Sequence, residues 1–90
     1  MKIEFDTEKR SKTLDERGLD FARAVDVFAG PVLTMADQRT DDGEARFITF
    51  GQLDMHLVVL VWTPRGAARR IISMRYANER EIARHAQSLG

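Results

Sequence analysis

The chain contains no cysteine among its 90 residues, which excludes a disulfide framework and a cysteine-based zinc site. The same absence fits a reducing compartment, so we expect the protein in the cytoplasm. Proline occurs only twice, and no apolar run approaches the roughly 20 residues of a membrane span. The first residues, Met1 to Asp6, contain no apolar stretch of the kind a secretory signal has. We therefore expect neither a membrane partner nor secretion.

Charge is balanced overall but not along the chain. Lys and Arg number 14, as do Asp and Glu, which by itself argues against a nucleic-acid partner. Residues 1–42 carry seven basic and ten acidic side chains, whereas residues 43–90 carry seven arginines and four acidic side chains. Arginine makes planar, bidentate contacts with phosphate, so the second half could present an RNA-binding surface. The alternative is that these arginines only decorate solvated edges.

Composition indicates one globular domain over residues 1–90, with 43% apolar and 31% charged residues. A strand is predicted at 2–5, and a helix from Asp6 or Thr7 to about Arg17, where Gly18 is a typical C-cap. Asp20 is a good N-cap for a second helix. Its apolar stripe has helical spacing and ends at Gly30-Pro31; the stripe consists of Phe21, Ala24, Val25 and Phe28.

The apolar period then changes from 3.6 to 2, which predicts strands. They are expected at 32–37, 45–50, 55–63 and from 67 or 68 to 76, separated by turns or breaks at 38–43, 51–54 and 64–66. Asn78 and Glu81 have the capping-box spacing and predict a final helix. The order β-α-α-β-β-β-β-α groups the helices, so we predict an α+β fold with a mostly antiparallel sheet packed on helices.

The last predicted strand carries the most informative arginines. Strict alternation puts Arg69 and Arg75 on one face and Arg70 on the other, without showing which face is open. Each of them could bind phosphate. The alternative for any one of them is a structural ion pair with Glu81 or Asp26.

Three further residues are candidates from their positions. Arg46 shares a strand face with Ile48 and Phe50, so it either extends to an edge or lies over a binding surface. His56 opens the central strand and is interpreted as a structural edge residue. His85 borders the inner face of the last helix and could act as an acid or base near neutral pH; the alternative is a packing histidine.

Several kinds of site have no motif in this sequence. There is no glycine-rich phosphate loop, no paired-histidine metal spacing and no Gly-x-Ser-x-Gly motif. Metal and nucleotide-cofactor chemistry are therefore not expected.

Several segments together resemble the BrnT family of toxins over nearly the whole chain. Phe21 to Phe28 matches the family's Phe-x-x-Ala-x-x-Val-Phe helix, and Gly43 to Phe47 matches Gly-Glu-x-Arg-Phe. Arg70 to Glu81 matches Arg-Ile-Ile-Ser-x-Arg-x-Ala-x-x-x-Glu. The last two strings in one chain are a specific combination.

The resemblance implies a RelE-like fold and a metal-independent ribonuclease that inhibits translation and growth. RNA would be the substrate, and the ribosome is a further candidate partner. A cognate, BrnA-like antitoxin would bind DNA, so that operator DNA is contacted only through the antitoxin. From the resemblance we take Arg46, Arg70 and Arg75 as candidate catalytic residues. The other candidates are His85 as acid or base, and Arg17, Arg65 and Arg69 as RNA contacts.

Two positions depart from the family pattern. Its turn histidine is Arg17 here, and its C-terminal aromatic, commonly Tyr, is His85 here. Arg17 can bind phosphate but, with a pKa above about 12, cannot accept a proton; His85 could replace the aromatic residue. Two other functions therefore stay open. One is a degenerate toxin that holds its antitoxin and tunes operon repression, and the other is an RNA-binding module without turnover.

Overall fold

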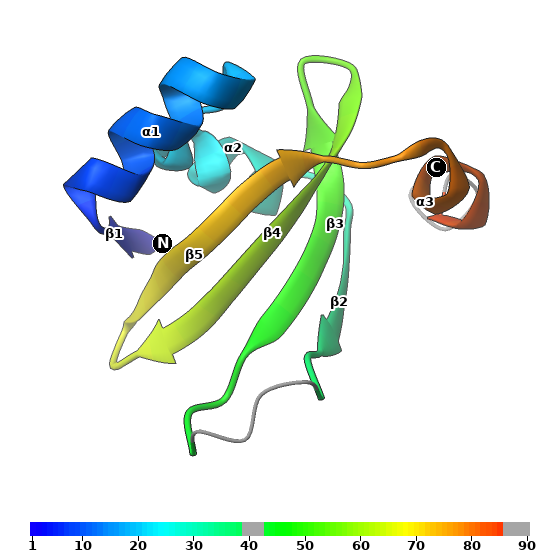
Figure 1. Ribbon diagram of the computed structural model, residues 1–90. Coiled ribbons are helices and arrows are strands. Elements are labelled where there is room, and N and C mark those ends of the chain that lie inside the picture. The colour runs from blue at the N-terminus through cyan, green and yellow to red at the C-terminus, as the bar shows by residue number, and fades with distance from the viewer. Residues whose placement is uncertain (39–42, 86–90) are drawn as a thin grey trace.

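A mixed sheet with strand order β1-β5-β4-β3-β2 forms the centre of the computed structural model (Figure 1). The structure describes residues 1–38 and 43–85. Within these ranges β1 is parallel to β5, and the other neighbouring strands are antiparallel. The elements are β1 Lys2–Phe5, α1 Thr7–Arg17, η1 Phe21–Arg23, α2 Ala24–Ala29, β2 Val32–Ala36, β3 Phe47–Leu53, β4 His56–Arg65, β5 Ala68–Tyr76 and α3 Glu79–His85. The predicted α+β class is confirmed.

The first helices begin and end where their local sequence directs. The Asp6 carboxylate accepts hydrogen bonds from the first-turn N–H groups of α1, and Gly18 ends that helix with φ of 71°. Asp20 caps the 3₁₀ turn η1 through the N–H of Ala22. The Asp20 carboxylate also receives two hydrogen bonds from Arg10, at 2.7 and 2.8 Å, which tie α1 to η1.

The main core lies between the sheet and the segment that contains η1 and α2. Its buried side chains are Leu19, Phe21, Ala24, Val27, Leu53, Val58, Leu60, Trp62, Ile71 and Met74. The predicted helical stripe is wrong at one position, because Val25 is 40% exposed whereas Val27 is fully buried. The first turn is a 3₁₀ turn with three residues per turn, which rotates the following α-helix relative to the predicted 3.6 period.

Two predicted strand boundaries are wrong. Of the predicted break at 51–54, residues 51–53 instead continue β3 to Leu53, and only Asp54 lies in the turn. A Cβ at Gly51 would lie 2.5 Å from Val27 Cγ1, so glycine is needed for close packing rather than for a turn. The real turn is Asp54-Met55, whose φ angles of 49° and 69° are both positive, which aspartate adopts readily and methionine rarely.

Two further boundaries concern turns. Pro64, predicted in a turn, belongs to β4, where it pairs with Arg69. Of the predicted turn at 38–43, residues 39–42 lie outside the described residues.

The opposite face of the sheet is covered much less. It carries a smaller cluster of Phe50, Leu57 and Val59. The chain leaves β5 toward α3, which Figure 1 shows on the side away from α1 and α2. We call this side the open face and the other side the helix-covered face.

Candidate nucleic-acid interface

A β-bulge in β5 decides which arginines share the open face. Val61 of β4 pairs with Ser73, but the next residue, Trp62, pairs with Ile71, so Ile72 is the extra residue. Ile71 and Met74 consequently both lie in the helix-covered core. The predicted strict alternation along β5 is therefore wrong beyond Ile71.

With this bulge, Arg70 and Arg75 come to the same face. Cross-strand partners project to the same side of a sheet. Arg70 pairs with Thr63 and Arg75 pairs with Val59, and these two β4 residues are an even number of positions apart, so their side chains share a face. Val59 belongs to the cluster on the open face. Arg70 and Arg75, with Ser73 between them, therefore lie on the open face.

Among the arginines of the open face, Arg70 is distinguished by its lack of a bonding partner in the described part of the chain. It is half-buried and makes no hydrogen bond or ion pair within the described ranges 1–38 and 43–85. Its cross-strand neighbour Thr63 is buried and donates a hydrogen bond from its hydroxyl to the carbonyl of Ala45. Nearby on β4, Arg65 donates to Glu44 Oε1 at 3.1 Å. This end of the open face thus combines the half-buried guanidinium of Arg70 with a polar frame, by which we mean the hydrogen-bonded groups of Thr63, Ala45, Glu44 and Arg65.

Arg46 lies immediately before β3, not within it as predicted. Phe47 packs on the helix-covered core, so alternation directs the half-buried Arg46 to the open face. The carbonyl of Arg46 accepts a hydrogen bond from the N–H of Asp37, at 2.9 Å, which fixes its backbone beside β2. Arg46 and Arg70 accordingly flank the buried Thr63.

Arg75, near the other end of β5, is held by α3. Its guanidinium donates two hydrogen bonds to Glu81, at 2.7 and 2.8 Å. Glu81 also completes the predicted capping box, accepting from the N–H of Asn78 while its own N–H donates to the Asn78 side chain. The hydrogen bonds from Arg75 are the main reason that the pKa of Glu81 falls to about 2. The structural ion pair considered for these arginines is therefore present at Arg75.

His85 is packed rather than open to solvent. It is 8% exposed, and its ring lies on that of Phe50 with centroids 4.2 Å apart and planes at 35°. The contact joins the end of α3 to β3 on the open face. His85, the last residue of α3, and Arg75 therefore lie on the same face of the sheet.

The three predicted RNA contacts do not lie together. Arg17 is at the end of α1, and its Nη1 donates to the carbonyl of Met74 at 3.0 Å. The guanidinium of Arg69 lies 4.5 Å from the ring centroids of both Phe28 and Trp62, on the helix-covered face. Arg65 lies at the β4–β5 hairpin.

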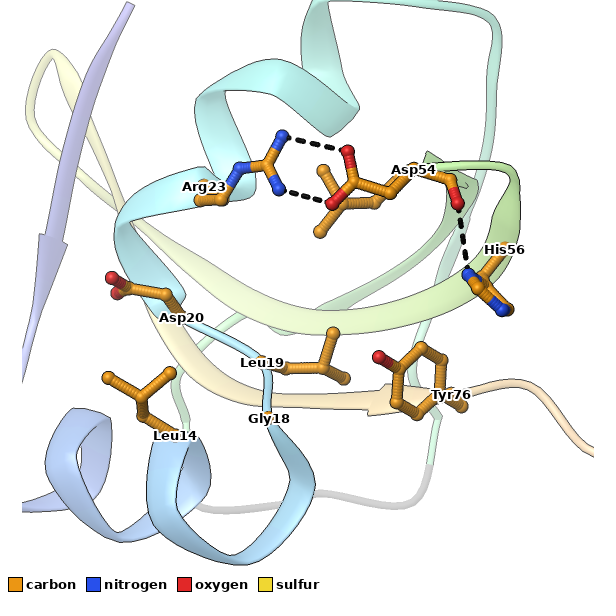
Figure 2. Close-up of a pocket in the computed structure, with 9 residues that line it drawn as sticks. Leu14, Gly18, Leu19, Asp20, Arg23, Asp54, His56 and Tyr76 are labelled. Atoms are coloured by element: carbon orange, nitrogen blue, oxygen red, sulfur yellow. Dashed lines mark hydrogen bonds and ion pairs between the residues drawn. The ribbon is translucent and has the colours of Figure 1, made fainter.

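Sequence reasoning missed a cavity of about 290 Å³ on the helix-covered side (Figure 2). The β3–β4 turn forms one wall, where Arg23 donates to the carboxylate of Asp54 through both terminal nitrogens. These bonds lower the pKa of Asp54. His56, interpreted from sequence as a structural residue, bonds the Asp54 carbonyl through Nδ1 at 3.0 Å and contacts the ring of Tyr76. The only sequence signal was the polar Asp54 next to an apolar strand.

Residues 1–38 and 43–85 contain neither a cluster of metal ligands nor a membrane-spanning helix. No three His, Asp or Glu side chains gather as a metal site would require. None of the helices in these ranges has the length and apolar character needed to cross a membrane.

Comparison with known proteins gives one positive result. Residues 5–81 match a family model described as the ribonuclease toxin BrnT of type II toxin–antitoxin systems. No curated protein matches the chain. The family match spans the strands and helices that carry every candidate residue except His85.

Proposed function

Because the chain belongs to the BrnT family of ribonuclease toxins of type II toxin–antitoxin systems, we propose that its open face binds and cleaves RNA without a metal ion. The observation that carries the proposal is the bulge at Ile72, which aligns Arg70, Ser73 and Arg75 on one face. Bulges often redirect side chains beside active sites. Cleavage of cytoplasmic RNA would inhibit translation and growth, with free or ribosome-bound RNA as the substrate. We also propose the RelE-like topology for this fold.

The reaction we propose is attack of a ribose 2′-hydroxyl on the adjacent phosphate. The 2′-oxygen forms a bond to phosphorus, the bond to the 5′-oxygen breaks, and a 2′,3′-cyclic phosphate and a 5′-hydroxyl result. One group must take the proton of the 2′-hydroxyl and another must supply a proton to the leaving oxygen. Negative charge grows on the phosphate oxygens, and fixed guanidinium groups stabilise it. Arg70 and Arg46 would do this, because they flank the polar frame around Thr63.

Arg75 and His85 belong to the same proposal at the other end of the face. Arg70 and Arg75 are five residues apart, or about 15 Å along a strand, so they would contact different phosphates. His85 is the proposed acid or base. His85 is buried on Phe50 at the Arg75 end, so α3 would have to shift to bring the ring toward the phosphate held by Arg70 and Arg46. We therefore expect activity to depend on how firmly α3 packs.

Arg17, Arg65 and Arg69 remain proposed RNA contacts. Arg65 lies at the hairpin beside Arg70 and would extend the phosphate path directly. Arg17 and Arg69 are on the helix-covered side, so they would be reached only by RNA that passes around an end of the sheet.

The family also implies an antitoxin partner. We propose that this antitoxin is BrnA-like and binds operator DNA, while the toxin itself contacts no DNA. A groove of about 280 Å³ between the β3–β4 turn and α3 favours protein contact there, because Met55 is 96% exposed and Ile82 is 44% exposed beside it.

A second candidate function is a degenerate toxin that only holds its antitoxin. What favours it is the state of two proposed catalytic residues: Arg75 is bound by Glu81, and His85 is buried on Phe50. This function predicts tight antitoxin binding with no RNA cleavage and no growth arrest.

The test is cleavage of total RNA by purified protein in EDTA, with Arg70→Ala beside the wild type. Arg80→Ala, which removes an exposed arginine of α3, is the matched control. We expect the wild type and Arg80→Ala to cleave and Arg70→Ala to be about 100-fold slower, as when one preorganised charge donor is lost. Intact RNA with folded wild-type protein, both free and ribosome-bound, would support the degenerate toxin instead.

A further inference from the structure

The cavity on the helix-covered side is separate from the open face and has the size of a small-molecule site. It is lined by the end of α1, the segment around η1, the β3–β4 turn and Tyr76 of β5 (Figure 2). At about 30 Å³ per water molecule, its roughly 290 Å³ would hold about ten waters. The end of α1 contributes Gly18, and a Cβ there would meet nothing within 4 Å, so this part of the rim is open.

The cavity offers apolar and aromatic surface for a flat ring. Leu19 and Leu53, 3% and 7% exposed, line it with apolar groups anchored in the main core. Tyr76 is 44% exposed, and its ring meets that of His56 edge to face, with centroids 5.4 Å apart. Figure 2 shows the Tyr76 hydroxyl turned inward, toward Leu19. An exposed, positioned tyrosine beside apolar residues is the kind of surface on which an unpaired base stacks.

The wall of the cavity formed by Arg23 and Asp54 can make hydrogen bonds to such a ring, and the opposite charges of these two side chains give the wall no net charge. Arg23 uses three N–H groups, one toward Asp26 and two toward Asp54, so two of its five remain. The Asp54 carboxylate accepts two of about four possible hydrogen bonds. The Arg23–Asp54 pair therefore presents donors and acceptors side by side, which matches the mixed edge of a nucleobase.

The balance of charge argues for a base rather than a phosphate in the cavity. Asp20 is paired with Arg10 and Asp54 with Arg23, so neither carboxylate is left without a cation and neither arginine is left without an anion. A neutral heterocycle fits this surface, whereas phosphate would compete with carboxylates for the arginines. Arg17, next to Gly18 and bonded to Met74 by one nitrogen, can contact a phosphate outside the rim.

We propose that this cavity binds a single unpaired nucleobase of the RNA, stacked on Tyr76 and hydrogen-bonded by Arg23 and Asp54. The proposal rests on RNA being the substrate and adds the site that sets base preference. RNA would leave the open face around the end of the sheet where β5 ends, with Arg17 holding the phosphate beside the bound base.

The test uses NMR titration of the purified protein with the four nucleoside 5′-monophosphates. Ribose 5-phosphate, which has the same phosphate but no base, is the control ligand. We expect at least one nucleotide to shift the amide signals of Gly18, Asp54 and Tyr76, and ribose 5-phosphate to leave them unchanged. Tyr76→Ala should weaken the binding of that nucleotide about tenfold. Met55→Ala, a neighbouring change outside the cavity, should not.

Other outcomes overturn the proposal. Equal shifts with ribose 5-phosphate would make this a phosphate site, and no shift with any nucleotide would leave it without a base ligand. If an antitoxin, and no nucleotide, shifts these signals, the cavity is a protein contact.

Mapping of cleavage sites separates this inference from the proposed function. Tyr76→Ala should still cleave RNA but with altered base preference, and an unchanged pattern would overturn the inference alone. Nucleotide binding with no cleavage by the wild type would overturn the ribonuclease and leave the base site standing.

Discussion

Replacing Arg75 with alanine should remove both a proposed RNA contact and the ion pair that holds α3. Arg75 and Glu81 are joined by two hydrogen bonds, with side chains 42% and 21% exposed. Pairs this accessible contribute about 0.2–1 kcal/mol, and the bidentate geometry favours the upper end of that range. Loss of about 1 kcal/mol in a domain of this size lowers Tm by about 4–8 °C.

Glu81→Gln separates the two effects. Glutamine at this position still caps α3 through Asn78, but it removes the charge that binds Arg75. Both variants should therefore lose about 1 kcal/mol of unfolding free energy. Only Arg75→Ala should lose cleavage, by about 100-fold, because the phosphate next to the reacting one is then no longer held in position.

The assay is thermal unfolding followed by circular dichroism, together with single-turnover RNA cleavage at a temperature where each variant is folded. The reasoning about Arg75 is refuted if both variants lose cleavage to the same extent. It is also refuted if Arg75→Ala cleaves at the wild-type rate, because Arg75 would then serve only to hold α3.

Three further predictions concern stability. The pKa of both Asp20 and Glu81 is lowered to about 2, so each carboxylate stabilises the fold at pH values above its unfolded pKa near 4. The free energy of unfolding, measured by acid titration, should therefore fall between about pH 5 and pH 2. A flat profile over that range would contradict this prediction. Gly51→Ala places a Cβ against Val27 and should cost about 1–3 kcal/mol in urea unfolding, whereas an unchanged midpoint would mean that α2 can move aside. Asn78→Ala removes the N-cap of α3 and should lower the stability of that helix by about 1 kcal/mol. Faster amide hydrogen exchange confined to α3 would show that the loss is local, whereas unchanged protection of α3 would refute the prediction.

Local sequence predicted the helix ends well. The Gly18 C-cap, the Asp20 cap and the Asn78–Glu81 capping box are each made within a few residues, so spacing along the chain is enough to recognise them. The resemblance to BrnT toxins is likewise confirmed by the family match.

The bulge at Ile72 could not be predicted from β5 alone. It depends on how Val61 and Trp62 of a different strand pair with Ser73 and Ile71. Without that pairing, Arg70 and Arg75 are assigned to opposite faces. Because a single extra residue inverts the alternation, the shared open face is knowable only from the assembled sheet.

The cavity was missed for a related reason. Its walls come from the end of α1, from the Arg23–Asp54 pair and from Tyr76, which are far apart in the sequence. No local pattern brings them together. The catalytic roles of Arg46, Arg70, Arg75 and His85, and the RNA contacts of Arg17, Arg65 and Arg69, stay predictions for the experiments above.

The central claim is that this protein cleaves RNA by 2′-hydroxyl attack without a metal ion. The most direct measurement is single-turnover cleavage, in EDTA, of a short RNA with one mapped site, beside the same RNA with a single 2′-deoxy substitution there. We predict that only the all-ribose RNA is cut and that its products end in a 2′,3′-cyclic phosphate and a 5′-hydroxyl. Cleavage of the deoxy-substituted RNA, or products with a 5′-phosphate, would contradict the account.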